Sequence, residues 1–437
     1  IEGAQEALEK ENPDWNFEKV KAQSAEAWNN LLSRIDVSGT EEQKVNFYTS
    51  IYHLCIQPNN ITDVDGRYRG PNDSILYSPI GEYYSTLSLW DTYRAAHPLY
   101  TLLVPEKVNG FVNSMLSHCD TQGYLPIWAL WGKENHCMIG NHAIPVIVDA
   151  YLKGYKGFDP ERAYEAIRKS SLESHPKSDW ETYNQYGYYP FDLIPEESVS
   201  RTLESCYDDY CVAQMAKALG KKEDYNFFSQ RARAYTSLFD PVTKLMRGKD
   251  SQGKWREPFD PFRLSHAGTS GGDYTEGNAW QYVWHVQHDV DSLIEMMGGN
   301  KAFTAKLDSL FWLENNTVNT GFVSDVTGLI GQYAHGNEPS HHVAYLYNYA
   351  GEFWKTQKLI REIFDHFYLP VSDGLCGNDD CGQMSAWYLF SAMGFYPVDP
   401  ISKEYIIGAP QLKEMILRLE GGKNFIIRAE GLSEENK

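Results

Sequence analysis

The sequence lacks any long uninterrupted apolar segment, and it lacks an excess of basic residues. No run of about 18 apolar residues occurs, so no membrane-spanning helix is predicted. The 437 residues include 59 acidic and 39 basic side chains, a formal net charge of −20. Nucleic acids and anionic membranes are bound by basic surfaces. The charge balance therefore argues against both as partners and selects no particular substrate.

The chain also lacks a disulfide pattern and a recognisable leader. Its seven cysteines are an odd number in a long chain, which does not predict a disulfide framework. No secretory signal peptide is visible, and the sequence opens on Ile1 rather than Met. We therefore expect a processed or trimmed piece of a longer protein.

Aromatic residues are abundant, at 14% of the chain, with 30 Tyr and 12 Trp. The faces of Tyr and Trp rings stack on the apolar faces of sugars, and both side chains have a polar tip. A large aromatic core explains the same composition. The 42% of hydrophobic residues permit such a core, so composition leaves both interpretations open.

Most of the chain shows the 3.6-residue periodicity of amphipathic helices. The clearest stretch is 199–219, where the apolar stripe ends at Gly220. Thr40 and Gln43 have the spacing of a capping box. The predicted helices are 17–35, 40–57, 88–102, 105–117, 139–153, 159–172, 199–219, 222–238, 276–297, 301–312, 340–351, 353–368 and 382–394.

About a dozen helices with few strand signals before residue 400 suggest a closed ring of helical hairpins. Long connections rich in Gly and aromatic residues separate them, and we expect these loops to gather at one mouth of the ring, where function usually lies. They are residues 120–138, 178–197, 247–275 and 313–339.

After residue 400 the apolar period changes from 3.6 to 2, which predicts a β-hairpin that turns at Gly421-Gly422. An isolated hairpin is marginally stable in water. We therefore expect residues 401–437 to belong to a β-sandwich whose remainder lies outside this chain. The predicted organisation is a helical linker over 1–40, a catalytic domain over 41–400 and this β segment.

Three acidic residues lie in loops with Gly and aromatic neighbours, as the two carboxyls of a glycosidase would. Glu276 stands among Tyr and Trp at a helix start, and an apolar wall raises the pKa of a carboxyl toward that of a working acid. Asp379 and Asp380 follow a Gly-bounded turn. The alternatives are structural: the helix dipole could stabilise Glu276 at the helix start, and Asp380 could cap the helix near 382.

Two further segments combine polar groups that suit a ligand. Residues 335–342 contain three His with Asn337 and Glu338, whose oxygens suit calcium better than zinc. A His-rich sugar-binding loop without metal is the alternative. In residues 89–98, Trp90 offers a stacking face and Asp91 can bind hydroxyls, whereas a helical Asp91–Arg94 ion pair is the alternative.

Two other motifs match only by their letters. Residues 268–272 spell a nucleophile elbow, but no strand precedes them. Residues 248–254 have the spacing of a phosphate-binding loop, but Trp255 stands where Mg²⁺ binding needs Ser or Thr. Both are interpreted as ordinary loops.

These segments and the aromatic loop from Trp128 to His142, taken in chain order, resemble glycoside hydrolase family 92, the calcium-dependent exo-α-mannosidases of bacteria. The likeness runs from about Ser85 to Pro410. The motifs that carry it are W-D-x-x-R at 90–94, Y-x-E-G-N-A-W-Q-Y at 274–282, H-G-N-E-P-x-H-H at 335–342 and G-N-D-D-x-G-Q-M-S-A-W-Y at 377–388.

The resemblance implies a mainly α fold, an (α/α)6 barrel that follows an N-terminal β-sandwich. It also implies removal of terminal α-linked mannose, most commonly α-1,2-linked, from glycans such as N-glycans. Inversion at the anomeric carbon is implied as well, for which the two carboxyls are about 6.5–9.5 Å apart. A periplasmic or secreted bacterial enzyme fits this role.

Carried over by position, the resemblance makes Glu276 the general acid and Asp380 the general base, with Asp379 as second candidate for the base. Asn337 and Glu338 are the expected Ca²⁺ ligands. The residues expected to bind the substrate are Trp90, Asp91, Trp128, Glu134, His335, His341 and His342. The alternatives are an (α/α)6 glycosidase for another sugar and a catalytically incompetent carbohydrate-binding fragment.

Overall fold

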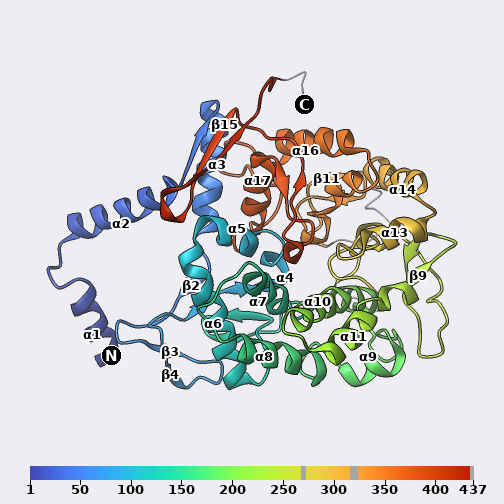
Figure 1. Ribbon diagram of the computed structural model, residues 1–437, viewed down its shortest axis with the longest axis horizontal. Helices are drawn as coiled ribbons and strands as arrows, with labels where there is room; N and C mark the ends of the chain where they lie inside the picture. The colour runs from blue at the N-terminus through green and yellow to red at the C-terminus, as the bar shows by residue number, and fades with distance from the viewer. Residues whose placement is uncertain (267–271, 315–322, 434–437) are drawn as a thin grey trace.

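A computed structural model describes residues 1–266, 272–314 and 323–433, and helices dominate it (Figure 1). The prediction of a mainly helical protein is therefore confirmed. The α-helices are α1 (Glu2–Glu11), α2 (Phe17–Leu32), α3 (Glu41–Leu54), α4 (Leu89–Thr92), α5 (Ala96–Leu103), α6 (Pro105–Gln122), α7 (Ala143–Leu152), α8 (Pro160–Leu172), α9 (Trp180–Tyr186), α10 (Ser198–Ala218), α11 (Lys222–Arg231), α12 (Ala279–Tyr282), α13 (Val290–Met297), α14 (Asn300–Trp312), α16 (Phe353–Phe367) and α17 (Gln383–Met393).

Some predicted helices are divided in the structure. The stretch 88–102 forms α4 and α5, and the restart at Ala96 places Pro98 in the first turn, where its missing N–H costs no hydrogen bond. The stretch 276–297 forms α12 and α13. The predicted helix 340–351 is instead the 3₁₀ helix η3 (Val343–Asn348). The described residues also form the 3₁₀ helices η1 (Ala234–Ser237), η2 (Glu338–Ser340), η4 (Pro400–Ser402) and η5 (Glu420–Gly422). Helix α9 was not predicted, and α1 lies within the predicted helical linker of residues 1–40.

The strands are mostly two or three residues long and pair within the connections between helices. They are β1 (Ile35–Ser38), β2 (Asn59–Asn60), β3 (Arg67–Arg69), β4 (Ile75–Tyr77), β5 (Tyr84–Ser85), β6 (Leu87–Ser88), β7 (Trp128–Leu130), β8 (Lys133–Glu134), β9 (Phe239–Asp240), β10 (Leu245–Met246), β11 (Leu329–Ile330), β12 (Tyr333–Ala334), β13 (Phe395–Tyr396), β14 (Ile406–Ile407), β15 (Glu414–Arg418) and β16 (Asn424–Arg428).

The C-terminal hairpin is part of a three-stranded sheet in the order β1-β15-β16. The expectation that this chain supplies no further strand to the hairpin is therefore corrected, because β1 pairs with β15 and places Ile35 opposite Leu417. On β16, Phe425 and Ile426 remain 47% and 45% exposed. The sheet thus has one strand more than predicted and an apolar outer strand that is incompletely covered.

The helical body closes through contacts between its first and last helices. Helix α17 packs against α3 and α5, which precede it by hundreds of residues, while α10 packs against α7, α8 and α11 (Figure 1). All eleven residues of α17 are buried. A helix that is buried on every side belongs to the centre of a large core.

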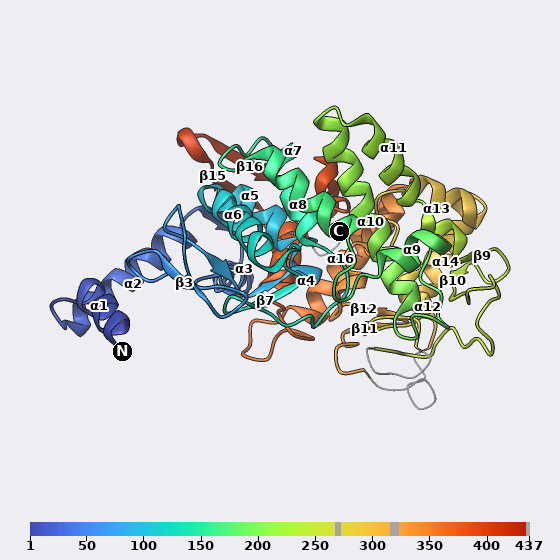
Figure 2. The same ribbon diagram turned by 90° about the horizontal axis from the view of Figure 1, so that it is seen from below.

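Helices α1 and α2 project from this body at the N-terminal end (Figures 1 and 2). Neither contains a buried residue; Trp15 between them is 69% exposed, and Phe17 at the start of α2 is 75% exposed. Within the described ranges, every helix is too short or too polar to span a bilayer. Residues 268–271 of the elbow-like motif and 315–322 of a predicted mouth loop lie outside the described residues.

Candidate active site

Three carboxylates from distant parts of the chain meet in one cluster. Asp91 comes from α4, Glu338 from the start of η2, and Asp380 from the turn before α17, and their nearest oxygens all lie within 4.8 Å of one another. Asp91 and Glu338 are buried, whereas Asp380 is partly exposed. The fold therefore joins the segments 89–98, 335–342 and 377–382, which the sequence left separate.

Burial and mutual repulsion work against ionisation in this cluster. Burial raises the pKa of Asp91 and of Glu338, and the charge of Asp380 raises both further. The Ser88 hydroxyl donates a hydrogen bond to Asp91. Oε1 of Glu338 is buried and has no hydrogen-bond partner among the described residues. A bound cation stabilises a buried carboxylate oxygen that lacks a hydrogen bond and lies next to two other carboxylates.

The turn that carries Asp380 has an unusual backbone. Asp380, Cys381 and Gly382 have φ values of 46°, 55° and 90°, in the left-handed region. A Cβ at Gly382 would lie 2.7 Å from Cα of Leu54, so this position requires glycine. Non-glycine residues in this region are strained and collect at functional sites.

Asp379 and Asp380 have different roles in this turn. Oδ1 of Asp379 accepts hydrogen bonds from the backbone N–H and the hydroxyl of Ser385, at 3.1 and 2.7 Å. The capping role considered for Asp380 thus falls to Asp379. Burial raises the pKa of Asp380 to about 6, with contributions from Asp379 and Asp325.

Hydrogen bonds fix the backbone at Glu276. Its φ of 48° is also left-handed, and two backbone hydrogen bonds pair the next residue, Gly277, with Ser265. The Asn337 amide donates to the carbonyl of Glu276 at 2.6 Å. Its side chain is 11% exposed, and burial, followed by the charges of Asp325 and Asp380, raises its pKa to about 8.

Both polar atoms of the Asn337 side chain, an expected metal ligand together with Glu338, bond to the backbone. Its Nδ2 bonds to the Glu276 carbonyl, and its Oδ1 accepts from the backbone N–H of Glu338 at 3.2 Å. These contacts link the two segments that carry Glu276 and Glu338.

The expected sugar-binding residues of segments 89–98 and 128–142 have mainly structural contacts. The Trp90 indole is 1% exposed, and its Nε1 donates to Glu204 at 3.1 Å. Trp128 is partly buried and packs against the cluster of Trp90, Met138 and Ile139. The Glu134 carboxylate accepts four backbone hydrogen bonds, from residues 127, 128, 135 and 136.

The three histidines expected to bind substrate are buried and hydrogen-bonded within the core. The ring nitrogens of His335 contact the hydroxyls of Tyr333 and Tyr368 at 2.8 Å. Those of His341 contact the His335 carbonyl and Gln383. Nε2 of His342 lies 2.8 Å from the Trp284 carbonyl. Burial lowers the pKa of all three.

Two charged neighbours of the acids escaped the sequence analysis. Asp325 raises the pKa of both Glu276 and Asp380, and Glu197 raises that of Glu276. Asp325 stands in a polar loop, and Glu197 follows another glutamate, so neither had a distinguishing pattern. Only the fold brings them to the site.

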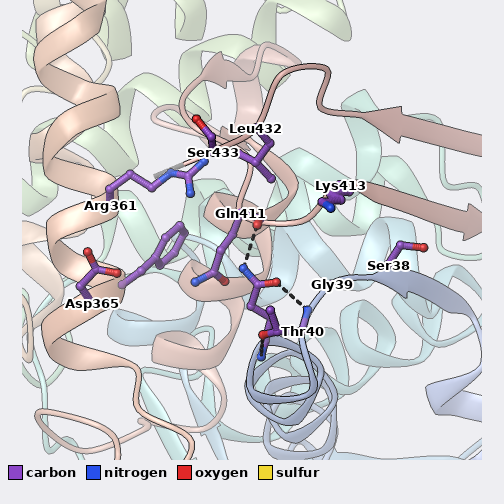
Figure 3. Close-up of a pocket in the computed structure, with 11 residues that line it drawn as sticks. Ser38, Gly39, Thr40, Arg361, Asp365, Gln411, Lys413, Leu432 and Ser433 are labelled. Carbon is purple, nitrogen blue, oxygen red and sulfur yellow. Dashed lines mark hydrogen bonds between the residues drawn. The ribbon is translucent and has the colours of Figure 1, made fainter. Parts of the chain in front are cut away.

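A cavity of about 950 Å³ lies elsewhere, between the start of α3, α16 and the C-terminal hairpin (Figure 3). Thr40, Gln43, Arg361, Gln411 and Lys413 are among its lining residues, and the Gln43 side chain bonds to Thr40 and Gln411. None of the clustered acids lines it. Chemistry, rather than size, therefore identifies the acidic cluster as the candidate site.

Residues 3–437 match the glycosyl hydrolase family 92 catalytic domain. The chain belongs to this family. Among solved structures, the family-92 α-mannosidase BT3965 from Bacteroides thetaiotaomicron, in complex with mannoimidazole, superimposes with a TM-score of 0.95 at 44% identity. The family-92 inverting mannosidase BT2199 from B. thetaiotaomicron VPI-5482 gives 0.88 at 37% identity.

The family-92 chain is shorter than these relatives. The similarities cover 99% of this chain but 57% and 60% of the two mannosidase chains. A protein of Arthroderma benhamiae described as an uncharacterized secreted glycosidase is 28% identical over 92% of this chain and 50% of its own length. The chain thus spans about half to three-fifths of these relatives.

Two carboxyls of the candidate site have different tendencies to ionise. Near neutral pH, a pKa of about 8 keeps Glu276 mainly protonated, and one of about 6 leaves Asp380 mainly ionised. Carboxyl pairs whose environments separate their pKa values supply an acid and a base at one pH.

Proposed function

We propose that the protein is an exo-acting α-mannosidase that removes terminal α-linked mannose, first of all α-1,2-linked mannose, from glycans with inversion. The observation that carries this proposal is the separation of the pKa values of Glu276 and Asp380 at one acidic site. The mannosidase relatives, one of them described as inverting and another with bound mannoimidazole, support the choice of sugar and of stereochemistry.

In this mechanism Glu276 is the general acid and Asp380 the general base. Glu276 donates its proton to the glycosidic oxygen as the bond to the anomeric carbon breaks. Asp380 accepts a proton from a water molecule, whose oxygen bonds to that carbon from the opposite face. Asp379 keeps its bond to Ser385 and so holds the turn that presents Asp380.

The carboxylate cluster fits a calcium ion. Asp91, Glu338 and Asp380 offer hard oxygen ligands in one place, and the unpartnered Glu338 Oε1 gains a partner when a cation binds. When bound, calcium supplies a positive charge that can hold neighbouring hydroxyls of the terminal sugar. Asp91 then orients the sugar beside the acid and the base.

The domain arrangement is also a proposal. Packing of α17 against α3 supports a closed (α/α)6 barrel over residues 41–400. An N-terminal β-sandwich outside this chain would complete the sheet β1-β15-β16 and cover Phe425, Ile426, Trp15 and Phe17. The greater length of the relatives supports this additional domain. A secreted or periplasmic location agrees with the fungal relative described as secreted.

The full-length protein is expected to release mannose from α-1,2-mannobiose, and a calcium chelator is expected to abolish the release. Proton NMR of the first product should show β-mannose, because inversion converts an α-linkage into the β-anomer. Readdition of calcium restores activity, whereas magnesium is the matched control ion. Absence of mannose release from every mannoside, with calcium present, would exclude the proposed substrate and leave a glycosidase for another sugar.

Calcium is expected to stabilise the fold more at pH 8 than at pH 5. Raised pKa values mean that the folded state holds protons that the unfolded state has lost, so stability without metal falls as pH rises above about 4.5. Deprotonated carboxylates bind the cation, which offsets this loss. At about 100 times its Kd, calcium contributes roughly 2.7 kcal/mol. Calorimetry at both pH values checks this, and a pH-independent shift of Tm would contradict it.

A further inference from the structure

Glu276 has a neighbour, His266, that the proposed mechanism does not use. Nδ1 of His266 lies 3.8 Å from Oε1 of Glu276 and 3.7 Å from Oε1 of Glu197. One ring nitrogen is therefore almost equally distant from two carboxyls. An N–H at this position can form a short, well-aligned hydrogen bond with only one of them at a time.

Glu197 is a buried residue beside Glu276, not a surface side chain. It precedes α10 with a φ of 59°, and only 2% of its surface is exposed. Its N–H donates to the Gly272 carbonyl, which ties it to the loop that leads to Glu276. Its Oε2 lies 3.7 Å from Arg201 and has no hydrogen-bond partner in the described part of the chain. A strained, buried carboxylate with an unsatisfied oxygen requires a functional explanation.

Glu276 and Glu197 attract an N–H donor at different stages of the reaction. Glu276 must be protonated before the reaction and becomes negative as it gives its proton to the leaving oxygen. Glu197 has the cationic Arg201 beside it. An N–H donor between them is attracted to Glu197 before the proton transfer and to Glu276 during it. Interactions that strengthen only in the transition state accelerate a reaction.

We propose that His266 and Glu197 are a positioning pair for the acid: the His266 N–H bonds to Glu197 while Glu276 is protonated and moves to Glu276 as its charge develops. This inference rests on the proposed function, because it needs Glu276 as the acid. The transferred proton passes from Glu276 to the glycosidic oxygen, and His266 keeps its own proton throughout. Only a hydrogen bond changes partner.

The distances permit this exchange. Both exceed the roughly 2.6–3.2 Å of a formed hydrogen bond, but catalytic contacts are often long without substrate and tighten in the complex. The His266 side chain is 34% exposed, so one side of its ring lies at the surface. A small rotation about its side-chain bonds brings Nδ1 toward either carboxyl.

The test compares a substrate that needs the acid with one that does not. His266→Ala in the full-length enzyme is expected to lower kcat on α-1,2-mannobiose by about ten- to a hundred-fold, the contribution of one hydrogen bond to a charged group, with little change in KM. Hydrolysis of α-mannosyl fluoride is expected to be unchanged, because fluoride leaves without a proton. His266→Asn keeps an N–H donor and should recover most of the activity. His366→Ala, on the exposed surface of α16, is the matched control.

A double-mutant cycle tests the pairing. If Glu197 acts through His266, Glu197→Gln combined with His266→Ala is expected to be no slower than His266→Ala alone. Wild-type kcat for His266→Ala on mannobiose, equal loss on both substrates, or additive losses in the cycle would each overturn the inference. Those results leave Glu276 as the acid, whereas a wild-type enzyme without mannosidase activity overturns the inference and the proposed function together.

Discussion

Glu276→Gln is expected to lower kcat on α-1,2-mannobiose by about 10²–10⁴-fold, the usual contribution of general acid catalysis. Gln has nearly the shape of Glu but no proton to give to the leaving oxygen. Hydrolysis of α-mannosyl fluoride should continue at close to the wild-type rate, since Asp380 still activates water. Steady-state kinetics on both substrates measure this difference.

The pH dependence gives a second measurement of the same residue. Burial and the charges of Asp325, Asp380 and Glu197 raise the pKa of Glu276 to about 8. Because the protonated form is the acid, kcat/KM on mannobiose is expected to fall as pH rises through about 8. With mannosyl fluoride this alkaline limb is expected to disappear. An equal loss on both substrates in Glu276→Gln, or an unchanged alkaline limb in that variant, would exclude Glu276 as the acid.

Local sequence patterns predicted many of the helices because apolar spacing and capping residues are local features of a chain. The stretch 199–219 corresponds to α10 at Ser198–Ala218, and the capping box of Thr40 and Gln43 is present at the start of α3. Strand β1 was missed because its pairing partner, β15, lies near the other end of the chain, with Ile35 opposite Leu417. No local pattern within Ile35–Ser38 reports that contact.

The same division between local and long-range information applies to the site. Loop context selected Glu276 and Asp380, and the structure adds their left-handed backbone and raised pKa values. The joining of Asp91, Glu338 and Asp380 depends on three segments that only the folded chain brings together. A His-rich loop looks like a ligand site in sequence, yet core hydrogen bonds occupy both ring nitrogens of His335.

Asp380→Asn is expected to lower kcat by about 10²–10⁴-fold on mannobiose and on α-mannosyl fluoride alike. A good leaving group replaces the acid but not the base, because water must still lose a proton as it attacks. Asp379→Asn is the matched control, since it makes the same chemical change one residue away. Its Oδ1 can still accept from Ser385, so α17 keeps its cap and kcat should remain within a few-fold of wild type.

Loss of calcium is the competing explanation for an inactive Asp380→Asn, because Asp380 belongs to the carboxylate cluster. The two explanations respond differently to added metal. If the variant only binds calcium more weakly, a large excess of calcium restores kcat, whereas a missing base is not replaced by metal. Activity that returns with calcium, or a loss in Asp379→Asn as large as in Asp380→Asn, would move the base role away from Asp380. Persistent inactivity on both substrates, with calcium-dependent Tm retained, would leave proton removal from water as the step that Asp380 performs.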